Sequence, residues 1–366
     1  MSGAPVLFSH PSSLRHDTGA HPEQPARIVA VERELEARDY LGFERVSSPA
    51  VERAVLLAVH PERHVGAIER AAAGGAASYR LDPDTVVSEG SFEAAEHAAG
   101  GAVGLVDRLV VGSAPTGFSA HRPPGHHAEV ARAMGFCLFN NVAVAARHAL
   151  DAHGLERVMI VDFDVHHGNG TDDIFHEEPR VLFCSVHQWP LYPGTGRAAD
   201  VGDGPGRGFT VNVPVAPMSG DAVFCSVIDS VAVALARVWE PQLLLISAGY
   251  DAHREDPLAD CLVTDGGFAA MTRSLRAAGD EVGAPVGAVL EGGYALGALA
   301  RGVAITMQEL AGGVGSGGLV GGVDSGELVG GVGGHGASGA GAGVRPVADV
   351  AAKARERLVQ FWPALS

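Results

Sequence analysis

Two stretches of this chain combine carboxylates and imidazoles at spacings that suit metal-assisted chemistry. In the first, residues 162–170 read Asp-Phe-Asp-Val-His-His-Gly-Asn-Gly and directly follow an apolar run at residues 158–161. If the extended spacing continues past this run, Asp162, Asp164 and His166 share one side of the chain. Carboxylate oxygens and imidazole nitrogens bind zinc, and a third ligand from elsewhere would leave one position for water. The pattern therefore favours a metal site over a buried polar network at a strand end.

The second stretch presents two adjacent imidazoles from a stiff loop. Residues 121–127 read His-Arg-Pro-Pro-Gly-His-His, so two prolines and a glycine constrain the backbone just before His126 and His127. General acid–base catalysis requires a ring held within hydrogen-bond reach of the reacting water. The rigid loop makes that role more credible for this pair than idle exposure to solvent.

Two further apolar runs end in residues that could complete such a site. Residues 243–253 read Leu-Leu-Leu-Ile-Ser-Ala-Gly-Tyr-Asp-Ala-His, so Asp251 is the natural third metal ligand. Residues 286–294 read Val-Gly-Ala-Val-Leu-Glu-Gly-Gly-Tyr and end at Tyr294. In parallel α/β sheets, ligands gather beyond the carboxyl ends of the strands. We therefore expect Asp164, His166 and Asp251 to meet around one divalent ion.

The remaining pattern predicts the elements that position these residues. Short apolar runs predict buried strands at residues 6–8, 116–120, 158–161, 181–187, 209–214 and 243–248, with the last strand beginning at residue 286. Helices are predicted at about 27–38, 51–75, 91–111, 141–153, 221–238 and 347–361. The alternation predicts a single-domain α/β fold with a mostly parallel central β-sheet flanked by helices. We assign residues 1–310 to this domain, 311–344 to a glycine-rich flexible insertion, and 345–366 to a terminal helix that packs back on the domain.

Four motifs resemble those of the histone deacetylase family and appear in the family's order. Residues 162–170 resemble its zinc motif, in the Asn-containing form of class II and bacterial members, and residues 122–127 match its catalytic histidine pair. Residues 247–252 are similar to its Ser-Ala-Gly-Phe-Asp-Ala, and residues 291–294 match its tyrosine segment, although Ala295 follows where Asn is frequent. The resemblance covers about residues 6–310 and the last helix, and it implies the arginase/deacetylase-like fold.

The resemblance implies two metal sites. Asp164, His166 and Asp251 would bind zinc, with one position left for water and substrate. A structural monovalent cation, expected to be potassium, would lie nearby, held by oxygens of Asp162 and Ser185 and by backbone carbonyls.

It also implies the catalytic roles. His127, facing Asn169, would be the general base and then the acid for the leaving amine, whereas His126, facing Asp162, would contribute as a cation. Because Asn169 is uncharged, His127 is predicted to be the less basic of the pair. Tyr294 would donate its hydroxyl hydrogen to the oxyanion.

For the substrate, the resemblance implies contacts from four residues. The Gly135 carbonyl would meet the substrate amide and Phe136 would line an acyl-lysine tunnel. Tyr192, where Phe is usual, would form the opposite wall, with Trp189 as a competitor for that place. Asp84 would accept hydrogen bonds from the substrate backbone at the rim, or simply form an Asx-turn.

Three other histidine-containing segments are assigned no chemistry. Residues 21–27 read His-Pro-Glu-Gln-Pro-Ala-Arg, also similar to the family, and are predicted to support the site structurally. His60 and His64 are four residues apart, but because no third donor is evident we predict a solvated helix face. His253 follows Asp251 as in the related arginases, which bind two manganese ions, but the further ligands of that site are missing, so we predict a non-ligand.

Composition limits the partners. The chain has 366 residues, of which 46% are hydrophobic, and a net charge of −17, which argues against nucleic acid and favours a cationic substrate. Cys137, Cys184, Cys225 and Cys261 are widely spaced, as expected for reduced thiols in a cytoplasmic protein. No signal peptide and no apolar run of about 18 residues is evident, so no membrane association is expected.

These observations predict zinc-dependent hydrolysis of N-acetyl or other N-acyl groups from lysine side chains or similar alkyl amines. An acetylpolyamine deacetylase is the alternative within enzymes, and it would need a narrow entrance, often formed between subunits. A non-catalytic acyl-group binder and a binuclear manganese ureohydrolase remain open. The acyl chain length, the physiological substrate, whether protein, peptide or polyamine, and the oligomeric state are not determined by the sequence.

Overall fold

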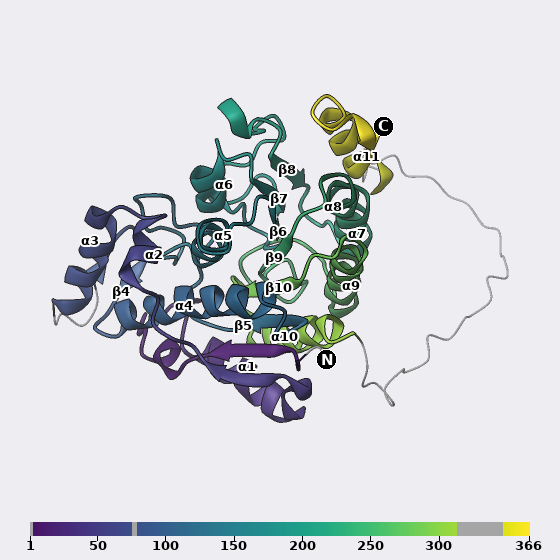
Figure 1. The fold of residues 1–366 in the computed structure, drawn as a ribbon. Helices are drawn as coiled ribbons and strands as arrows, with labels where there is room; N and C mark the ends of the chain where they lie inside the picture. Colours follow the sequence, from purple (N-terminus) through teal and green to yellow (C-terminus); the bar gives the residue numbers. More distant parts are fainter. Residues whose placement is uncertain (1–2, 75–78, 313–346) are drawn as a thin grey trace, which may run out of the picture.

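A central parallel sheet organises the molecule (Figure 1). The computed structural model describes residues 3–74, 79–312 and 347–366, and within them the sheet has eight strands in the order β2-β1-β5-β10-β9-β6-β7-β8. All neighbouring strands are parallel. The strands are β1 (Val6–Ser9), β2 (Glu44–Ser47), β5 (Thr116–Ser119), β6 (Val158–Asp162), β7 (Val181–Gln188), β8 (Thr210–Val215), β9 (Leu243–Ala248) and β10 (Val286–Leu290). The predicted fold class is confirmed.

The inner strands are buried on both faces, which explains their continuous apolar runs. In β6, Met159 and Val161 pack into one hydrophobic cluster, whereas Val158 and Ile160 pack into another on the opposite face. The strand β9 divides its leucines in the same way. Because successive side chains point to opposite faces of a sheet, such strands must be apolar at every position.

Helices cover both faces. On one side lie α2 (Arg53–Leu57), α3 (Glu62–Ala73), α4 (Ser91–Val110), α5 (Asn141–Asp151) and α6 (Asn169–Phe175). On the other lie α1 (Ala26–Glu36), α7 (Asp221–Val227), α8 (Val233–Trp239), α9 (Asp265–Val282), α10 (Leu296–Leu310) and α11 (Val347–Leu358). A two-strand hairpin of β3 (Tyr79–Arg80) and β4 (Val86–Val87) stands apart from the main sheet. In Figure 1, α7, α8 and α9 stand together on one side of the strands, and α4 and α5 on the other.

The helices α7 and α8 are joined by a π-helical turn, Ile228–Ala232, into one helical run. By length and composition this run, Asp221–Trp239, could cross a membrane, and it is the one such helix in the described residues. Its apolar residues Phe224, Val231 and Leu235 are fully buried in the core beside the sheet. That burial is typical of a core helix of a globular protein.

The terminal helix α11 packs against α7 and β8. Ala354 and Leu358 are buried in the same hydrophobic cluster as the apolar side of α7. Just beyond the helix, Trp362 Nε1 donates a hydrogen bond of 2.9 Å to the carbonyl of Gly208. Of the predicted insertion at 311–344, residues 313–344 lie outside the described residues, as do residues 345–346 of the predicted terminal segment.

The sequence-based prediction omits β2, β3, β4, α6, α9 and α10, and two of these omissions have a clear physical reason. The strand β2 lies at the sheet edge and is mostly exposed, so it carries polar residues such as Glu44 and Arg45 and gives no apolar run. The helix α9 begins at Thr264, whose hydroxyl accepts a hydrogen bond from the amide of Gly267, but its glycine pair and interspersed charges hide the apolar face.

Candidate active site

The polar residues that follow three adjacent strands meet at the carboxyl edge of the sheet. Asp162 ends β6, Asp251 follows β9, and Tyr294 follows β10, and the sheet order places β10, β9 and β6 side by side. This is the edge at which parallel sheets collect ligands, because the connecting loops there are free to carry function. The site is therefore assembled from segments that lie more than a hundred residues apart in the chain.

Asp164, His166 and Asp251 converge within this edge. Their ligating atoms all lie within 4.8 Å of one another. His166 Nδ1 is 3.2 Å from Asp164 Oδ1 and 3.1 Å from Asp251 Oδ2. The loop is folded so that the amide of Val165 donates to Asp251 Oδ1 at 2.9 Å. The three side chains therefore lie together, as the sequence predicts.

The electrostatics of the cluster favour a cation. Asp164 and Asp251 are both 0% exposed, and buried carboxylates are very costly without compensating positive charge. Burial alone would lower the pKa of His166, but the carboxylates of Asp251 and Asp164 raise this pKa to about 10. Two carboxylate oxygens and an imidazole nitrogen are a ligand set that zinc prefers, so the residues present fit that ion.

Two glycines make room for these carboxylates. A Cβ atom on Gly249 would lie 1.9 Å from Asp164 Oδ2, and one on Gly292 would lie 2.2 Å from Asp251 Oδ2. The Gly292 amide instead donates to Asp164 Oδ2 at 2.8 Å. Any side chain at either position would displace a carboxylate, which gives a physical reason for glycine in both motifs.

His126 and His127 lie beside this cluster with different partners. His126 Nδ1 is 2.9 Å from Asp162 Oδ2, and His127 Nδ1 is 2.8 Å from Asn169 Oδ1. Although burial opposes it, Asp164 and Asp162 raise the pKa of His126 well above its ordinary value. Burial and the positive charge of His126 lower the pKa of His127 well below its ordinary value. The predicted order of basicity agrees with these directions.

The loop that carries the histidine pair is held by a residue that the sequence analysis left without a role. Glu291 Oε2 accepts hydrogen bonds from the amides of Gly125 and His126, at 2.7 and 3.0 Å. Burial raises the pKa of Glu291 to about 7. The available signal was that Glu291 lies three residues before Tyr294, in the same motif. The sequence does not show, however, that Glu291 binds the loop that carries His126.

The segment at residues 21–27 supports the site, as predicted. Glu23 forms buried ion pairs with both Arg27 and Arg122, and all three side chains are 0% exposed. Arg27 Nε then donates to the carbonyl of Gly293 at 2.7 Å, and its Nη2 donates to that of Glu291 at 2.5 Å. The network ties the histidine loop and the glycine turn to one helix start.

Tyr294 is positioned by its backbone and by its ring. Asp256 Oδ2 accepts hydrogen bonds from the amides of Tyr294 and Ala295, at 2.6 and 3.1 Å. Arg27 lies over the phenol ring, 5.1 Å from its centroid, and Phe136 meets it edge-on at 5.7 Å. Asp256 is a positioning residue that the sequence analysis missed, because nothing in its neighbourhood marks a contact with the turn after β10.

A cavity of about 220 Å³ opens onto this cluster. It is lined by Asp84, His127, Gly135, Phe136, His166, Leu191, Tyr192, Leu258 and Tyr294. All four residues predicted to contact substrate line it. Tyr192 is among them and meets His127 edge-on at 5.2 Å, whereas Trp189 lines a separate pocket beside Arg197.

Gly135 and Phe136 adopt unusual backbone conformations to reach this cavity. Their φ angles are +56° and +70°, in the left-handed region that favours glycine. A Cβ atom on Gly135 would lie 2.4 Å from His127 Cδ2, so only glycine allows this close approach. Phe136 is held there by a hydrogen bond from its amide to Thr85 Oγ1 at 3.2 Å.

Asp84 is half-buried at the edge of the same cavity. Asp82 Oδ1 accepts a hydrogen bond from the Asp84 amide at 3.0 Å, which is the Asx-turn considered above. Burial and the neighbouring charge of Asp82 raise the pKa of Asp84. Asp84 therefore both takes part in an Asx-turn and lines the cavity.

Asp162 and Ser185 are paired neighbours across the ladder of β6 and β7. Asp162 Oδ1 accepts from the amide of Asp164 at 3.1 Å, and Ser185 Oγ is 2.9 Å from His187 Nδ1. Both residues are 0% exposed, so their side-chain oxygens are buried.

The remaining histidines lie apart from the cluster. His253 Nε2 lies 3.2 Å from Asp265 Oδ1. The prediction of a solvated face for His60 and His64 is wrong, because they are 0% and 6% exposed. His60 Nδ1 donates to the carbonyl of Val130 at 3.1 Å, and its Nε2 accepts from the Asn140 amide at 2.9 Å.

Comparison with known proteins accounts for this geometry. Residues 21–310 match the family model described as the histone deacetylase domain. The chain is 37% identical over 331 residues to histone deacetylase 14, chloroplastic, of Arabidopsis thaliana, covering 85% of this chain and 78% of that protein. It is 38% identical over 296 residues to a probable deacetylase of Archaeoglobus fulgidus, covering 80% and 81% of the two chains. A crystal structure of the HDA15 HD domain superposes with a TM-score of 0.86 at 32% identity, covering 100% of this chain and 97% of that one.

Proposed function

The chain belongs to the histone deacetylase family, and on that premise we propose that it hydrolyses N-acetyl groups from lysine side chains or similar alkyl amines in a zinc-dependent reaction. The observation that carries this proposal is the convergence of Asp164, His166 and Asp251 beside a cavity that His127 and Tyr294 also line. These are the donors and acceptors that amide hydrolysis requires at one place.

Zinc would be held by Asp164, His166 and Asp251, and it would supply polarisation of the amide carbonyl and a lowered pKa for the attacking water. A structural potassium ion beside Asp162 and Ser185 is part of the same proposal. It rests on the family resemblance and on the two buried residues that lie side by side there.

His127 is suited to move the proton. Because Asn169 Oδ1 faces its Nδ1 atom, that atom carries the hydrogen, and Nε2 is left with a lone pair that can accept a proton from water. The same Nε2 proton then passes to the nitrogen of the leaving amine as the C–N bond breaks, so acetate and a free amine are the products. The cationic His126, held by Asp162, stabilises negative charge that develops beside it.

Tyr294 would donate to the oxygen on which negative charge develops. Burial raises the pKa of Tyr294 well above its ordinary value, so the hydroxyl keeps its hydrogen throughout the working pH range. Phe136 and Tyr192, which line the cavity, would supply flat apolar faces for an alkyl chain, and the Gly135 carbonyl would accept a hydrogen bond from the substrate amide.

An acetylated polyamine is the second candidate substrate. It is favoured by two neighbouring carboxylates, because Asp84 lines the cavity and Asp82 Oδ1 accepts a hydrogen bond from the Asp84 amide. A polyamine carries positive charges along its chain, and these carboxylates would attract them.

The deciding experiment compares acetyl-lysine peptides with acetylspermidine as substrates, each with zinc and with a chelator. We expect release of acetate from the peptides, its loss on chelation and its recovery when zinc is returned. Faster turnover of acetylspermidine would instead favour the polyamine reaction. Binding of either substrate without zinc-dependent turnover would contradict both and support a non-catalytic acyl-group binder.

A further inference from the structure

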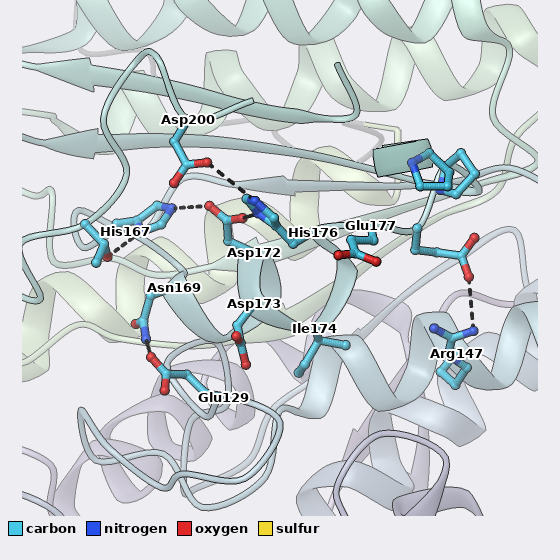
Figure 2. A pocket seen from close by; sticks show the side chains of 14 residues that line it. Glu129, Arg147, His167, Asn169, Asp172, Asp173, Ile174, His176, Glu177 and Asp200 are labelled. Atoms are coloured by element: carbon cyan, nitrogen blue, oxygen red, sulfur yellow. Dashed lines mark hydrogen bonds and ion pairs between the residues drawn. The ribbon is translucent and has the colours of Figure 1, made fainter. Parts of the chain in front are cut away.

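A second cavity in the described residues is larger than the one beside Tyr294. It has a volume of about 800 Å³ and is bordered by α6 and by the segment at residues 195–205, and it shares Asn169 with the active site (Figure 2). Six carboxylates line it: Glu129, Asp172, Asp173, Glu177, Glu178 and Asp200. The arginine among its lining residues, Arg147, is paired with Glu178 at 3.3 Å. The cavity therefore attracts cations.

Within this cavity, three side chains form a compact cluster. Asp172 and His176 are four residues apart along α6 and its end, and Asp200 approaches from the facing segment. His176 Nδ1 is 2.7 Å from Asp172 Oδ1, and its Nε2 is 3.9 Å from Asp200 Oδ1. One ligating atom from each residue lies within 4.8 Å of the other two.

His167 adds a second and independent observation. Its side chain is only 2% exposed, yet its Nε2 atom has no hydrogen-bond partner in the part of the chain that the structure describes. That atom points toward Asp172, whose Oδ2 is 3.3 Å away (Figure 2). The other ring nitrogen, Nδ1, is occupied by Thr195 Oγ1 at 2.8 Å. The contact with Asp172 is an ion pair and not an aligned hydrogen bond, so the hydrogen-bonding capacity of this buried nitrogen is left unmet, which costs free energy unless a ligand binds it.

We propose that Asp172, His176 and Asp200 hold a second divalent metal ion, with His167 Nε2 as its fourth ligand. Two imidazole nitrogens and two carboxylate oxygens favour zinc, cobalt or nickel over magnesium or calcium, which prefer oxygen alone. The charges of Asp172 and Asp200 balance that of the ion.

The cluster needs only a small adjustment to bind. Ligand atoms about a tetrahedral zinc ion lie roughly 3.3 Å apart, and those of Asp172, His176 and Asp200 lie within 4.8 Å of one another, so the outermost of these three must move inward by up to about 1.5 Å. Asp200 is 42% exposed and His176 is 35% exposed, so both can move. Asp172 is fixed, because Asn212 Nδ2 donates to its Oδ2 at 3.2 Å.

The ion would fasten α6 to the segment that carries Thr195 and Asp200. Because α6 begins at Asn169, the proposed ion would lie less than two helical turns from the Asn169 side chain that faces His127. Its role is therefore structural support of that helix, distinct from the chemistry of the zinc that Asp251 would hold.

A second group of potential ligands provides the matched control. His148 and His153 both direct Nε2 to Asp107 Oδ1, at 2.8 and 2.7 Å. Their nitrogens are thus satisfied by the carboxylate, and no buried nitrogen there lacks a partner among the described residues. We expect no tightly held ion at this group.

The test measures metal content of the full chain. The protein is stripped with a chelator, dialysed against a micromolar excess of zinc, and its zinc per chain is counted by mass spectrometry of the metal. We expect His176→Gln and Asp200→Asn each to lower the content by one ion relative to the unaltered chain, and His148→Gln to leave it unchanged. Equal zinc in the unaltered chain and in both cavity variants, with circular dichroism confirming that all are folded, would overturn the proposal.

Asp251→Asn separates this proposal from the proposed function. If both sites exist, Asp251→Asn and His176→Gln remove one ion each, and the double variant removes two. If the active site holds no zinc, Asp251→Asn changes nothing while His176→Gln still removes one ion. Cobalt substituted for zinc gives an independent signal, since loss of His176 should remove one component of the visible absorption spectrum.

Discussion

The imidazole rings of His126 and His127 lie with their centroids 4.0 Å apart, yet their Nδ1 atoms face partners of different charge. His126 faces the carboxylate of Asp162, whereas His127 faces the amide of Asn169. Two identical side chains in contact are thereby given different proton affinities, because only one of them has an anion to stabilise its charged form. This asymmetry suits His127 to accept a proton and His126 to remain charged.

Replacing the amide should move the pH profile. In Asn169→Asp, a carboxylate beside His127 would raise the pKa of that imidazole by about 1–3 units. Because the base must be unprotonated to accept a proton, the acidic limb of kcat/KM should move to higher pH, and activity at acidic pH should fall. The measurement is the pH dependence of kcat/KM on an acetyl-lysine peptide.

Glu129 supplies the control for that variant. Asn169 Nδ2 donates to Glu129 Oε1 at 2.9 Å, so Asn169→Asp also places two carboxylates together. Glu129→Gln alone removes the negative charge of Glu129 and leaves Asn169 beside His127. The acidic limb of its kcat/KM profile should therefore stay near that of the unaltered chain. The double variant Asn169→Asp with Glu129→Gln places one carboxylate beside His127 without a second one next to it. If the acidic limb is unshifted both in Asn169→Asp and in this double variant, His127 does not set the pKa of that limb.

Removing the phenol hydroxyl should stop turnover without loss of structure. Tyr294→Phe deletes the proposed oxyanion donor, and loss of one such donor costs about 100- to 1,000-fold in kcat. Zinc content should be retained, because Tyr294 is not among the converging ligands. Tyr250→Phe is the matched control, since Tyr250 Oη donates to Thr306 Oγ1 at 2.9 Å within the core and should affect stability more than kcat. Near-normal kcat in Tyr294→Phe would contradict the mechanism.

A single methyl group at Gly135 should disable the site. In Gly135→Ala, the new Cβ would lie 2.4 Å from His127 Cδ2 and would also be strained at a φ of +56°. Displacing a catalytic ring by about 1 Å costs on the order of 100-fold in kcat/KM. The exposed Gly297→Ala, in the first turn of α10, is the control and should keep full activity. If Gly135→Ala were as active as that control, the close approach to His127 would not matter for turnover.

Buried neutral histidines should make the fold sensitive to acid. Burial, together with the neighbouring His64, lowers the pKa of His60 to about 3 in the folded chain, against 6.5 for the free group. As the pH falls below 6.5 the unfolded chain takes up the proton and the folded chain does not, so stability decreases from pH 6.5 toward 3. The slope for one such group is about 1.4 kcal/mol per pH unit.

His60→Gln should lessen that slope. Unfolding in urea, measured between pH 6.5 and 4, should show a smaller loss of stability per pH unit in this variant than in the unaltered chain. Val59→Ala also destabilises this part of the core but removes no titrating group, so its slope should be unchanged. Parallel slopes for all three chains would show that His60 takes up its proton while the chain is folded.

The catalytic edge could be predicted because its signals are local. Strands buried on both faces must be apolar throughout, so β6, β9 and β10 are continuous in the sequence and the polar residues stand where each one ends. The glycines that admit Asp164 and Asp251 are also adjacent in sequence to the strands that they serve. Order along the chain then sufficed to propose which side chains meet.

Residues whose role depends on distant backbone could not be predicted in the same way. Glu291 binds the amides of Gly125 and His126, and Asp256 binds that of Tyr294, across contacts that no local pattern encodes. His60 is buried because Val130 and Asn140 fold over it, although its own helix start resembles an exposed one. In each case the missing information is which loop lies opposite.

The order of strands in the sheet has a consequence for how the chain matures. The side chains proposed to bind zinc follow β6 and β9, and the last of the three neighbouring strands, β10, lies near the C-terminal end of the family domain. In a nascent chain whose strand β9 has not yet paired with β6 and β10, Asp164 and His166 lack the third side chain of the cluster, Asp251. Capture of the proposed ion would therefore be a late event in assembly, and a variant that loosens β9 should lose metal before it loses its helices.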